Sequence, residues 1–401
     1  MIDPKVVINT LSVEELCEAA ESHFRTIQDF VPHIGKPFSS FFEAPVILQN
    51  MGQLLAGLQL GKTMTVLEFA AGTCWFSRFL SQMQCQTISC DASASALNAG
   101  KRLFAEYPII GKPISEPRFL PFDGHKIDLP SASVDRIVCH DGFHHVPNQE
   151  EILQEFGRIL KLGGIAGFSE PGRLHSRSPQ SQYEMQNYKI LENDIVLPEI
   201  FSTAKRHGFT DLRVRVSSEM DLSFEEQQSF TAGMQNSVLD ASILNNIRNI
   251  MSNRTLFFLH KGAHVSDSRS HVGLSHAMGR AKNWLGRLNA LSVKAGEELS
   301  IPLKISNTGS ARWLNENIDN IGVVFIGTHL YDDRHTLLNL DFARFALPAP
   351  VEPGAELSQT IKLRFSTPGT YIVSVDLVSE GICWFEIVGS TPLTLQIHVH
   401  E

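Results

Sequence analysis

Three acidic residues stand close to short apolar segments, 65–69, 87–90 and 134–139, in the first third of the chain. Glu68 lies within the first segment, Asp91 directly follows the second, and Asp123 precedes the third. The strands of a doubly wound parallel sheet end at one edge, where ligands bind, so we expect these carboxylates to lie near one another. Carboxylates accept hydrogen bonds from ribose hydroxyls and from amino groups. The spacing therefore predicts a site for a ligand that contains a nucleoside.

A turn of small residues, 70–74, separates Glu68 from a segment of helical length. Small residues allow a sharp turn and a close approach of the ligand, and the N–H groups at the start of the next helix point toward that ligand. The turn lacks the three-glycine spacing of dinucleotide-binding folds, and Trp75 occupies the third position. Because Trp75 should prevent close contact between strand and helix, we expect a nucleoside without a pyrophosphate.

Two histidines, His140 and His144, follow the apolar segment 134–139. A histidine with an ordinary pKa can take a proton from a hydroxyl group at neutral pH, so both are candidate general bases. The alternative, that they cap the next helix or touch the edge of a cofactor, stays open. Their spacing mimics the H-E-x-x-H motif of zinc proteases, but that motif requires one helix and His140 ends an apolar segment. We therefore expect no metal ion at this pair.

The elements that must position these residues change in character along the chain. Over residues 1–262, short apolar segments alternate with helical patterns, which indicates an α/β fold with a parallel sheet covered on both faces. Residues 263–284 are polar without a strong period, and we expect a linker there. Over residues 285–401, apolar residues recur at every second position between turn signals, which predicts an antiparallel β-sandwich of immunoglobulin-like size.

The ordered set of motifs resembles the class I S-adenosylmethionine-dependent methyltransferases. Glu68-Phe69-Ala70-Ala71-Gly72-Thr73-Cys74 stands where that family has acid-x-Gly-x-Gly-x-Gly, and His144-His145-Val146 and Leu160-Lys161-Leu162-Gly163-Gly164 match a later turn and hairpin. The resemblance covers residues 60–262. It implies a Rossmann-like, doubly wound, mostly parallel seven-stranded sheet, a helical cap over residues 1–60 that closes over cofactor and substrate, and S-adenosylmethionine as the cofactor.

The same resemblance implies which residues contact the cofactor. They are Glu68, Ala70, Gly72, Thr73, Asp91, Ala92, Asp123, Gly124 and His140. Asp91 matches the acid that binds the ribose, and Asp123-Gly124 matches the pair that contacts the adenine. The chain departs from the family pattern at Ala70 and Cys74, where glycines are usual. Ala70 is a mild change if its φ is negative, whereas Cys74 is expected to add bulk near the cofactor.

Composition restricts the partners and the compartment. The chain has 401 residues, of which 43 are acidic and 34 basic, and this net charge of -9 disfavours nucleic acids and anionic membranes as partners. The chain has no apolar stretch long enough to span a membrane and no pattern of a secretory signal. Six scattered cysteines without a C-x-x-C pair are typical of a reducing compartment, so we expect a cytoplasmic protein.

These observations predict an enzyme that moves a methyl group from S-adenosylmethionine to a hydroxyl or amine of a small-molecule or glycan acceptor, with S-adenosylhomocysteine as product. Residues 285–401 loosely resemble immunoglobulin-like modules of bacterial surface-glycan enzymes, which implies a binding or assembly role. Trp313, Tyr331 and Trp384 could stack on sugars, although a tryptophan in a sandwich is more often a core residue. A homo-oligomer stays open. The alternative is a catalytically degenerate binding protein that acts through its sandwich.

Overall fold

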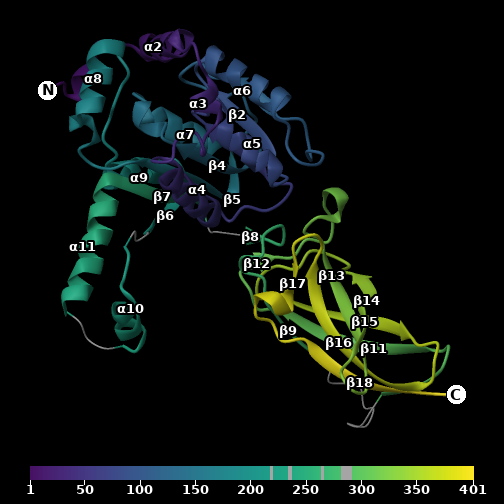
Figure 1. Cartoon of the computed structure of the whole chain (residues 1–401). Helices are drawn as coiled ribbons and strands as arrows, with labels where there is room; N and C mark the ends of the chain where they lie inside the picture. Colours follow the sequence, from purple (N-terminus) through teal and green to yellow (C-terminus); the bar gives the residue numbers. More distant parts are fainter. Residues whose placement is uncertain (217–219, 234–236, 263–265, 281–290) are drawn as a thin grey trace. The chain divides into compact units, whose positions relative to one another are not determined.

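The computed structural model describes residues 1–216, 220–233, 237–262, 266–280 and 291–401 (Figure 1). The chain divides into two compact units. The N-terminal unit comprises Met1–Leu58 and Met64–His264, and the C-terminal unit comprises Gln59–Thr63 and Val265–Glu401. Among the described residues, no helix has both the length and the apolar character needed to cross a bilayer.

A seven-stranded sheet forms the centre of the N-terminal unit, with the strand order β3-β2-β1-β4-β5-β7-β6. The strands are β1 (Thr65–Phe69), β2 (Gln86–Asp91), β3 (Arg118–Pro121), β4 (Val134–His140), β5 (Leu160–Pro171), β6 (Phe209–Arg215) and β7 (Arg254–Lys261). Strands β1 to β5 pair in parallel, and only β7 runs antiparallel to its neighbours β5 and β6. The order reverses between β1 and β4, the position where doubly wound sheets bind ligands. The predicted Rossmann-like, mostly parallel sheet is confirmed.

Helices pack against this sheet through their apolar faces. The helices after the first 60 residues are α5 (Trp75–Gln82), α6 (Ala94–Glu106), α7 (Gln149–Ile159), α8 (Pro179–Tyr188), α9 (Leu197–Arg206), α10 (Phe224–Thr231) and α11 (Ser237–Asn253). Phe143, Phe156, Phe168 and Phe257 are buried together in the core, where the rings of Phe168 and Phe257 stack with centroids 4.5 Å apart. Burial of these large rings supplies much of the hydrophobic free energy that holds helices to sheet.

The first 58 residues form four helices, α1 (Pro4–Thr10), α2 (Val13–Thr26), α3 (Val31–Ile34) and α4 (Ala44–Leu58). Helix α2 begins with a capping box, in which the side chains of Ser12 and Glu15 each accept a hydrogen bond from the backbone N–H of the other. Helix α4 packs so closely on the sheet that a Cβ on Gly57 would lie 2.1 Å from Cζ of Phe258. The N-terminal segment is therefore helical and is packed against the sheet.

The C-terminal unit is rich in antiparallel strands, as predicted. Its strands are β8 (Ser266–Asp267), β9 (His276–Arg280), β10 (Leu291–Lys294), β11 (Glu298–Asn307), β12 (Ala311–Arg312), β13 (Val324–Asp332), β14 (Leu337–Ala346), β15 (Glu356–Arg364), β16 (Gly369–Ser379), β17 (Cys383–Trp384) and β18 (Leu393–His400). One sheet has the order β10-β18-β16-β13-β14, with β17 beside β16, another has the order β15-β11-β9, and β12 pairs with β8. Two pairs, β10 with β18 and β12 with β8, are parallel. Trp313 is fully buried in the core that the two larger sheets share.

The segment 263–284, which we expected to be a linker, contains strands β8 and β9 within its described residues. Strand β9 pairs with β11, so this part of the segment belongs to the C-terminal unit. Several of its polar residues are buried, and some of these are hydrogen bonded: Ser268 Oγ donates to Gly322 O at 2.6 Å, and His276 Nε2 lies 2.5 Å from Asp376 Oδ1. The prediction of a linker is wrong because a segment whose polar residues are buried with hydrogen-bond partners can have the same amino-acid composition as a solvated linker.

Candidate functional site

A cavity of about 320 Å³ lies at the carboxyl ends of β1, β2 and β4. Its lining includes Glu68, Ala70, Gly72, Thr73, Asp91, Ala92, Gly124 and His140, so eight of the nine predicted contact residues meet at one place. Helix α2 supplies part of the wall through Leu16, Cys17 and Ala20, and His33 and Lys36 add polar groups. The cavity is thus enclosed by the sheet edge on one side and by the N-terminal helices on another.

Glu68 is buried at the base of the small-residue turn. Its Oε2 atom accepts hydrogen bonds from the backbone N–H of Ser77, at 2.8 Å, and from the Ser77 hydroxyl, at 2.5 Å. Burial penalises the charged carboxylate and raises the pKa of Glu68 to about 8, although both hydrogen bonds from Ser77 oppose the shift. The carboxyl group of Glu68 therefore favours its neutral form in the ligand-free protein at pH 7.

The turn after β1 contains three left-handed residues, Ala70, Gly72 and Cys74, with φ values of 54°, 51° and 59°. Alanine at position 70 was expected to be a mild change only if its φ were negative. Its φ is positive, so Ala70 carries backbone strain. Cys74 is buried against helix α6, where a Cβ on Gly100 would lie 2.4 Å from its Sγ. The structure corrects the expectation that Cys74 adds bulk to the site, because its side chain is not among the described residues that line the cavity.

Asp91 ends strand β2 and links two turns at the cavity. Its Oδ2 accepts a hydrogen bond from the N–H of Gly72 and its Oδ1 accepts one from the N–H of Ser93, both at 2.7 Å. Burial raises the pKa of Asp91, and the two backbone donors oppose that shift. Each carboxylate oxygen has a second lone pair, so Asp91 can accept further hydrogen bonds from a ligand.

Asp123 is exposed and is not one of the described residues that line the cavity. Its Oδ1 accepts hydrogen bonds from the N–H groups of His125 and Lys126, both at 2.8 Å, and these bonds lower the pKa of Asp123. The neighbouring Gly124 does line the cavity, with φ at 95°. Of the predicted adenine pair, the structure therefore brings only Gly124 to the site.

His140 lies at the end of β4 and lines the cavity. Its side chain is 7% exposed, and its ring packs edge-on against Trp75 with centroids 5.4 Å apart. Burial lowers the pKa of His140, which favours the neutral ring. Its Nε2 atom is buried and has no hydrogen-bond partner in the described parts of the chain. A neutral imidazole ring can accept a proton at one nitrogen and donate one at the other.

His144 lies behind the cavity wall, in the 3-10 helix η1 (Phe143–His145), and His145 lines the cavity in its place. His144 Nδ1 lies 2.7 Å from Glu170 Oε2, and Glu170 also accepts from the N–H groups of Gly142 and Phe143 at 3.1 and 2.9 Å. Burial disfavours the charged ring, but the contact with Glu170 outweighs it and raises the pKa of His144. This geometry does not present His144 as a base to a ligand in the cavity.

Two residues that hold the site together were not singled out from the sequence. Glu21 of α2 accepts hydrogen bonds from Ser93 and Ser95 at the start of α6, and so fastens the N-terminal helices over the cavity. Glu170 lies near the end of β5 and orders the loop after β4. Glu170 has a signal in the sequence, since it is another acid at the end of an apolar strand, whereas Glu21 has none.

Part of the N-terminal unit is similar to known proteins. Residues 67–168 match the family described as "Methyltransferase domain". A ubiquinone/menaquinone biosynthesis C-methyltransferase of Coxiella burnetii is 28% identical over 127 residues, which are 30% of this chain and 49% of that protein. A demethylmenaquinone methyltransferase of Streptomyces griseus is 26% identical over 124 residues, 30% of this chain and 50% of its own. The chain thus spans about half the length of the curated relatives it matches.

The chain also shows a similarity of lower identity to solved structures. A phosphoethanolamine N-methyltransferase 2 of Haemonchus contortus in complex with S-adenosyl-L-methionine has a TM-score of 0.43 and 15% identity, over 63% of this chain and 60% of that one. A geranyl diphosphate C-methyltransferase of Streptomyces coelicolor has a TM-score of 0.41 and 12% identity, over 62% and 97% of the two chains. The match with the methyltransferase family over residues 67–168 supports the expected resemblance, and Glu68, Asp91 and His140 all lie within the matched region.

Proposed function

We propose that the chain transfers a methyl group from S-adenosylmethionine to a hydroxyl or amine of a small-molecule or glycan acceptor. The observation that carries the proposal is the cavity at the sheet edge, where Glu68, Gly72 and Asp91 meet within the region that matches methyltransferases. A doubly wound sheet by itself would not specify this activity, because the same fold serves many functions.

The residues at the cavity fit a cationic nucleoside. The Asp91 carboxylate retains lone pairs for two ribose hydroxyls while it holds the N–H groups of Gly72 and Ser93. Glu68 lies behind the turn, and although it favours its neutral form in the free protein, its ionised form would favour a positive charge in front of the turn. Gly124 and Phe122 border the part of the cavity that we assign to the adenine, and we assign no contact to Asp123.

When bound, S-adenosylmethionine supplies a methyl group on a positively charged sulfur, whose bond to that carbon breaks as the bond to the acceptor forms. The protein aligns the two partners in a cavity that excludes water. For a hydroxyl acceptor, we assign the departing proton to Nε2 of His140, since that atom is buried, unpartnered in the described structure and on a ring held neutral by burial. His144 is assigned a positioning role through Glu170.

The C-terminal unit is proposed to be an immunoglobulin-like sandwich that binds the acceptor or assembles the protein. Trp313 is fully buried and takes no part in stacking on sugars. Trp384 is half-buried, with the guanidinium of Arg344 4.7 Å from its ring centre and the ring of His329 4.0 Å away. A carbohydrate would have to bind elsewhere on this unit or displace Arg344.

Calorimetric titration of the full chain with S-adenosylmethionine and with S-adenosylhomocysteine tests the proposal. We expect both to bind, and we expect Asp91→Ala to weaken binding by about 10-fold or more, because hydrogen bonds to a charged group contribute about 1.5–3 kcal/mol. The matched variant Asp123→Ala should change the affinity less than about threefold, since that carboxylate is outside the cavity. If folded wild-type protein binds neither compound, the proposal is wrong. That result would favour the alternative, a binding protein without cofactor chemistry.

A further inference from the structure

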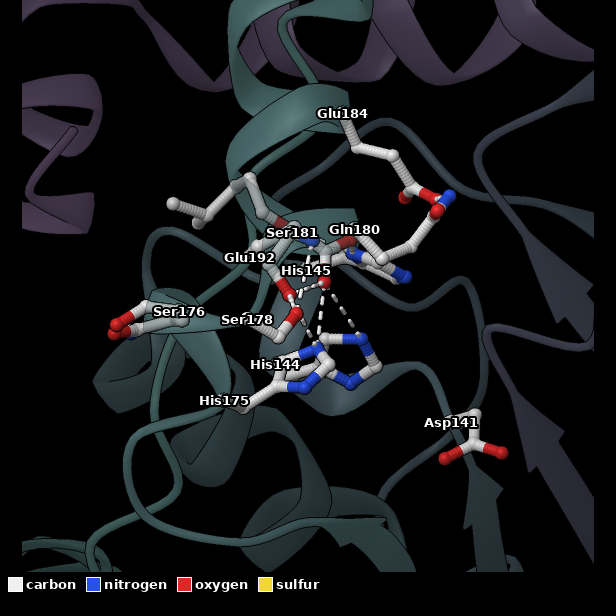
Figure 2. A network of polar contacts seen from close by, with 12 residues as sticks. Asp141, His144, His145, His175, Ser176, Ser178, Gln180, Ser181, Glu184 and Glu192 are labelled. Atoms are coloured by element: carbon white, nitrogen blue, oxygen red, sulfur yellow. Dashed lines mark hydrogen bonds and ion pairs between the residues drawn. The ribbon is translucent and has the colours of Figure 1, made fainter. Parts of the chain in front are cut away.

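Three histidines surround one buried carboxylate beside the cavity (Figure 2). Glu192 has a side chain only 4% exposed, and its Oε2 lies 2.6 Å from Nε2 of His175 and 3.9 Å from Nε2 of His144. Its Oε1 lies 3.3 Å from Nδ1 of His145. One possible ligand atom from each of His144, His145 and Glu192 lies within 4.8 Å of the other two. The four side chains come from three separate segments of the chain, so tertiary packing alone brings them together.

The contacts of His144 direct one of its two ring nitrogens toward Glu192. Glu170 accepts a hydrogen bond from Nδ1 of His144, because a carboxylate has no proton to donate. Nε2 of His144 then lies 3.9 Å from Oε2 of Glu192, which is too long for a hydrogen bond. A metal ion between these two atoms would contact both.

The distance between His144 and Glu192 suits a metal ion. Bonds from Zn²⁺ to histidine nitrogen and carboxylate oxygen are about 2.0–2.2 Å long, so two ligands of one ion are separated by at most about 4.2 Å. The separation between His144 Nε2 and Glu192 Oε2 falls within this limit. The contact of His144 with Glu170 is also the arrangement in which a carboxylate orients a metal-bound histidine through its other nitrogen. Imidazole and carboxylate together favour Zn²⁺ and its neighbours in the transition series over Ca²⁺ or Mg²⁺.

We propose that His144, His145 and Glu192 bind one divalent transition-metal ion, with His175 as a fourth ligand. When the ion binds, the proton that His175 Nε2 shares with Glu192 leaves to solvent. Nδ1 of His145 donates a hydrogen bond to Leu191 O at 2.7 Å, so its proton moves to Nε2 of the same ring, by exchange with solvent, before Nδ1 can bind the ion. This site is distinct from the H-x-x-x-H pair considered in the sequence, because His140 faces the cavity and takes no part. The ion would fasten the segment that carries Leu191 and Glu192 to η1, and Leu191 and His145 both line the cavity.

Metal content of the tag-free full chain tests the proposal directly. The protein is stripped with a chelator, dialysed against Zn²⁺ alone and analysed by mass spectrometry for zinc per chain, and a parallel sample receives Co²⁺ alone. We expect one retained ion per chain and, for Co²⁺, the visible absorption of a site with nitrogen ligands. A folded protein that retains no ion would overturn the proposal. Any positive charge between His144 and Glu192 would then be a proton and not a metal ion.

Variants locate the ion. Glu192→Gln keeps the side-chain size and should weaken Zn²⁺ binding by about 100-fold or more, since even the loss of an orienting group costs about 10–100-fold. His175→Gln is less buried and serves if Glu192→Gln does not fold. His125→Gln is the matched control, because His125 also lies between two carboxylates, Glu14 and Glu151, but on the surface. Equal affinity in wild type, Glu192→Gln and His175→Gln would place the ion elsewhere and overturn the assignment.

The same samples are titrated with S-adenosylmethionine, which separates this proposal from the proposed function. Metal retention without cofactor binding would uphold the metal site and reject the methyltransferase. Cofactor binding by a protein that retains no ion would support the methyltransferase and reject the metal site.

Discussion

Glu21 of helix α2 and Ser93 at the start of helix α6 are joined by a hydrogen bond of 2.6 Å from the serine hydroxyl to the carboxylate. The same carboxylate accepts from the N–H and the hydroxyl of Ser95, at 3.0 and 2.7 Å. Burial penalises its charge, but these donors and Arg25 together lower the pKa of Glu21 to about 2. An ionised group at neutral pH therefore connects the helices that enclose the cavity to the sheet edge.

Glu21→Gln should loosen helix α2. One carboxylate oxygen becomes an NH₂ group that faces donors, and the loss of hydrogen bonds to a charged group costs about 1.5–3 kcal/mol. Hydrogen–deuterium exchange of residues 13–26 measures this loss directly. The control Glu18→Gln lies on the same helix with a side chain 63% exposed, and it should change protection by less than about 0.5 kcal/mol. Equal exchange in both variants would show that Glu21 does not hold the helix.

Gly124→Ala should weaken cofactor binding. A Cβ at Gly124 would lie 2.6 Å from Cγ1 of Val13, so helix α2 must move outward, and overpacking of this kind costs about 1–3 kcal/mol. Gly111→Ala is the control, because Gly111 also has a positive φ, of 82°, but open space around it. Both variants should lower the melting temperature through backbone strain. Calorimetry should show reduced affinity for S-adenosylmethionine in Gly124→Ala alone, and equal affinities would contradict the contact.

Ala70→Gly should stabilise the N-terminal unit modestly. A left-handed conformation costs a non-glycine residue about 1–2 kcal/mol, and the greater freedom of glycine in the unfolded chain offsets about 0.5–1 kcal/mol of the gain. Ala71→Gly is the control, since Ala71 is buried and is not among the residues with positive φ. It should destabilise by about 1 kcal/mol. Chemical denaturation followed by a probe in residues 65–82 compares them, and a loss of stability in both would argue against strain at Ala70.

Binding of S-adenosylmethionine should release a proton from Glu68 near pH 7. The pKa of Glu68 is about 8 in the folded protein and near 4.5 in an unfolded chain, so Glu68 is mostly neutral at pH 7 and a cationic ligand favours its ionised form. Titrations in phosphate and in Tris, which differ in ionisation enthalpy, should give different apparent binding enthalpies. Glu68→Gln should abolish the difference, and buffer-independent enthalpies in the wild type would refute the assignment.

The same shift predicts how stability depends on pH. Because the folded-state pKa lies above the unfolded one, Glu68 contributes stability below pH 4.5, and that contribution is lost as the pH rises toward 8. The difference in free energy of unfolding between wild type and Glu68→Gln should therefore change in favour of the variant over this range. A constant difference would show that Glu68 titrates normally.

The strands around the site could be predicted because they are continuous apolar segments. The positions of Glu68, Asp91 and His140 at the cavity could be predicted because each residue lies near the end of such a strand. The direction of the Cys74 side chain could not, since it depends on the left-handed backbone and on the space beside Gly100. Asp123 has the right spacing but is used by the N–H groups of its own loop. The cluster around Glu192 has no sequence pattern, because packing between distant segments creates it.

The buried Nε2 of His140 also determines which compounds the cavity should select. A buried polar atom without a partner costs about 1–3 kcal/mol, so the free protein carries that cost at the end of β4. A ligand that places a hydrogen-bonding group at this nitrogen recovers the free energy, and an analogue without that group does not. Two methyl acceptors of equal size and apolar area, of which only one has this hydrogen-bonding group, would then differ in affinity by roughly 10-fold or more. Under the proposed function, discrimination between methyl acceptors therefore begins at a single imidazole nitrogen, before any bond is made or broken.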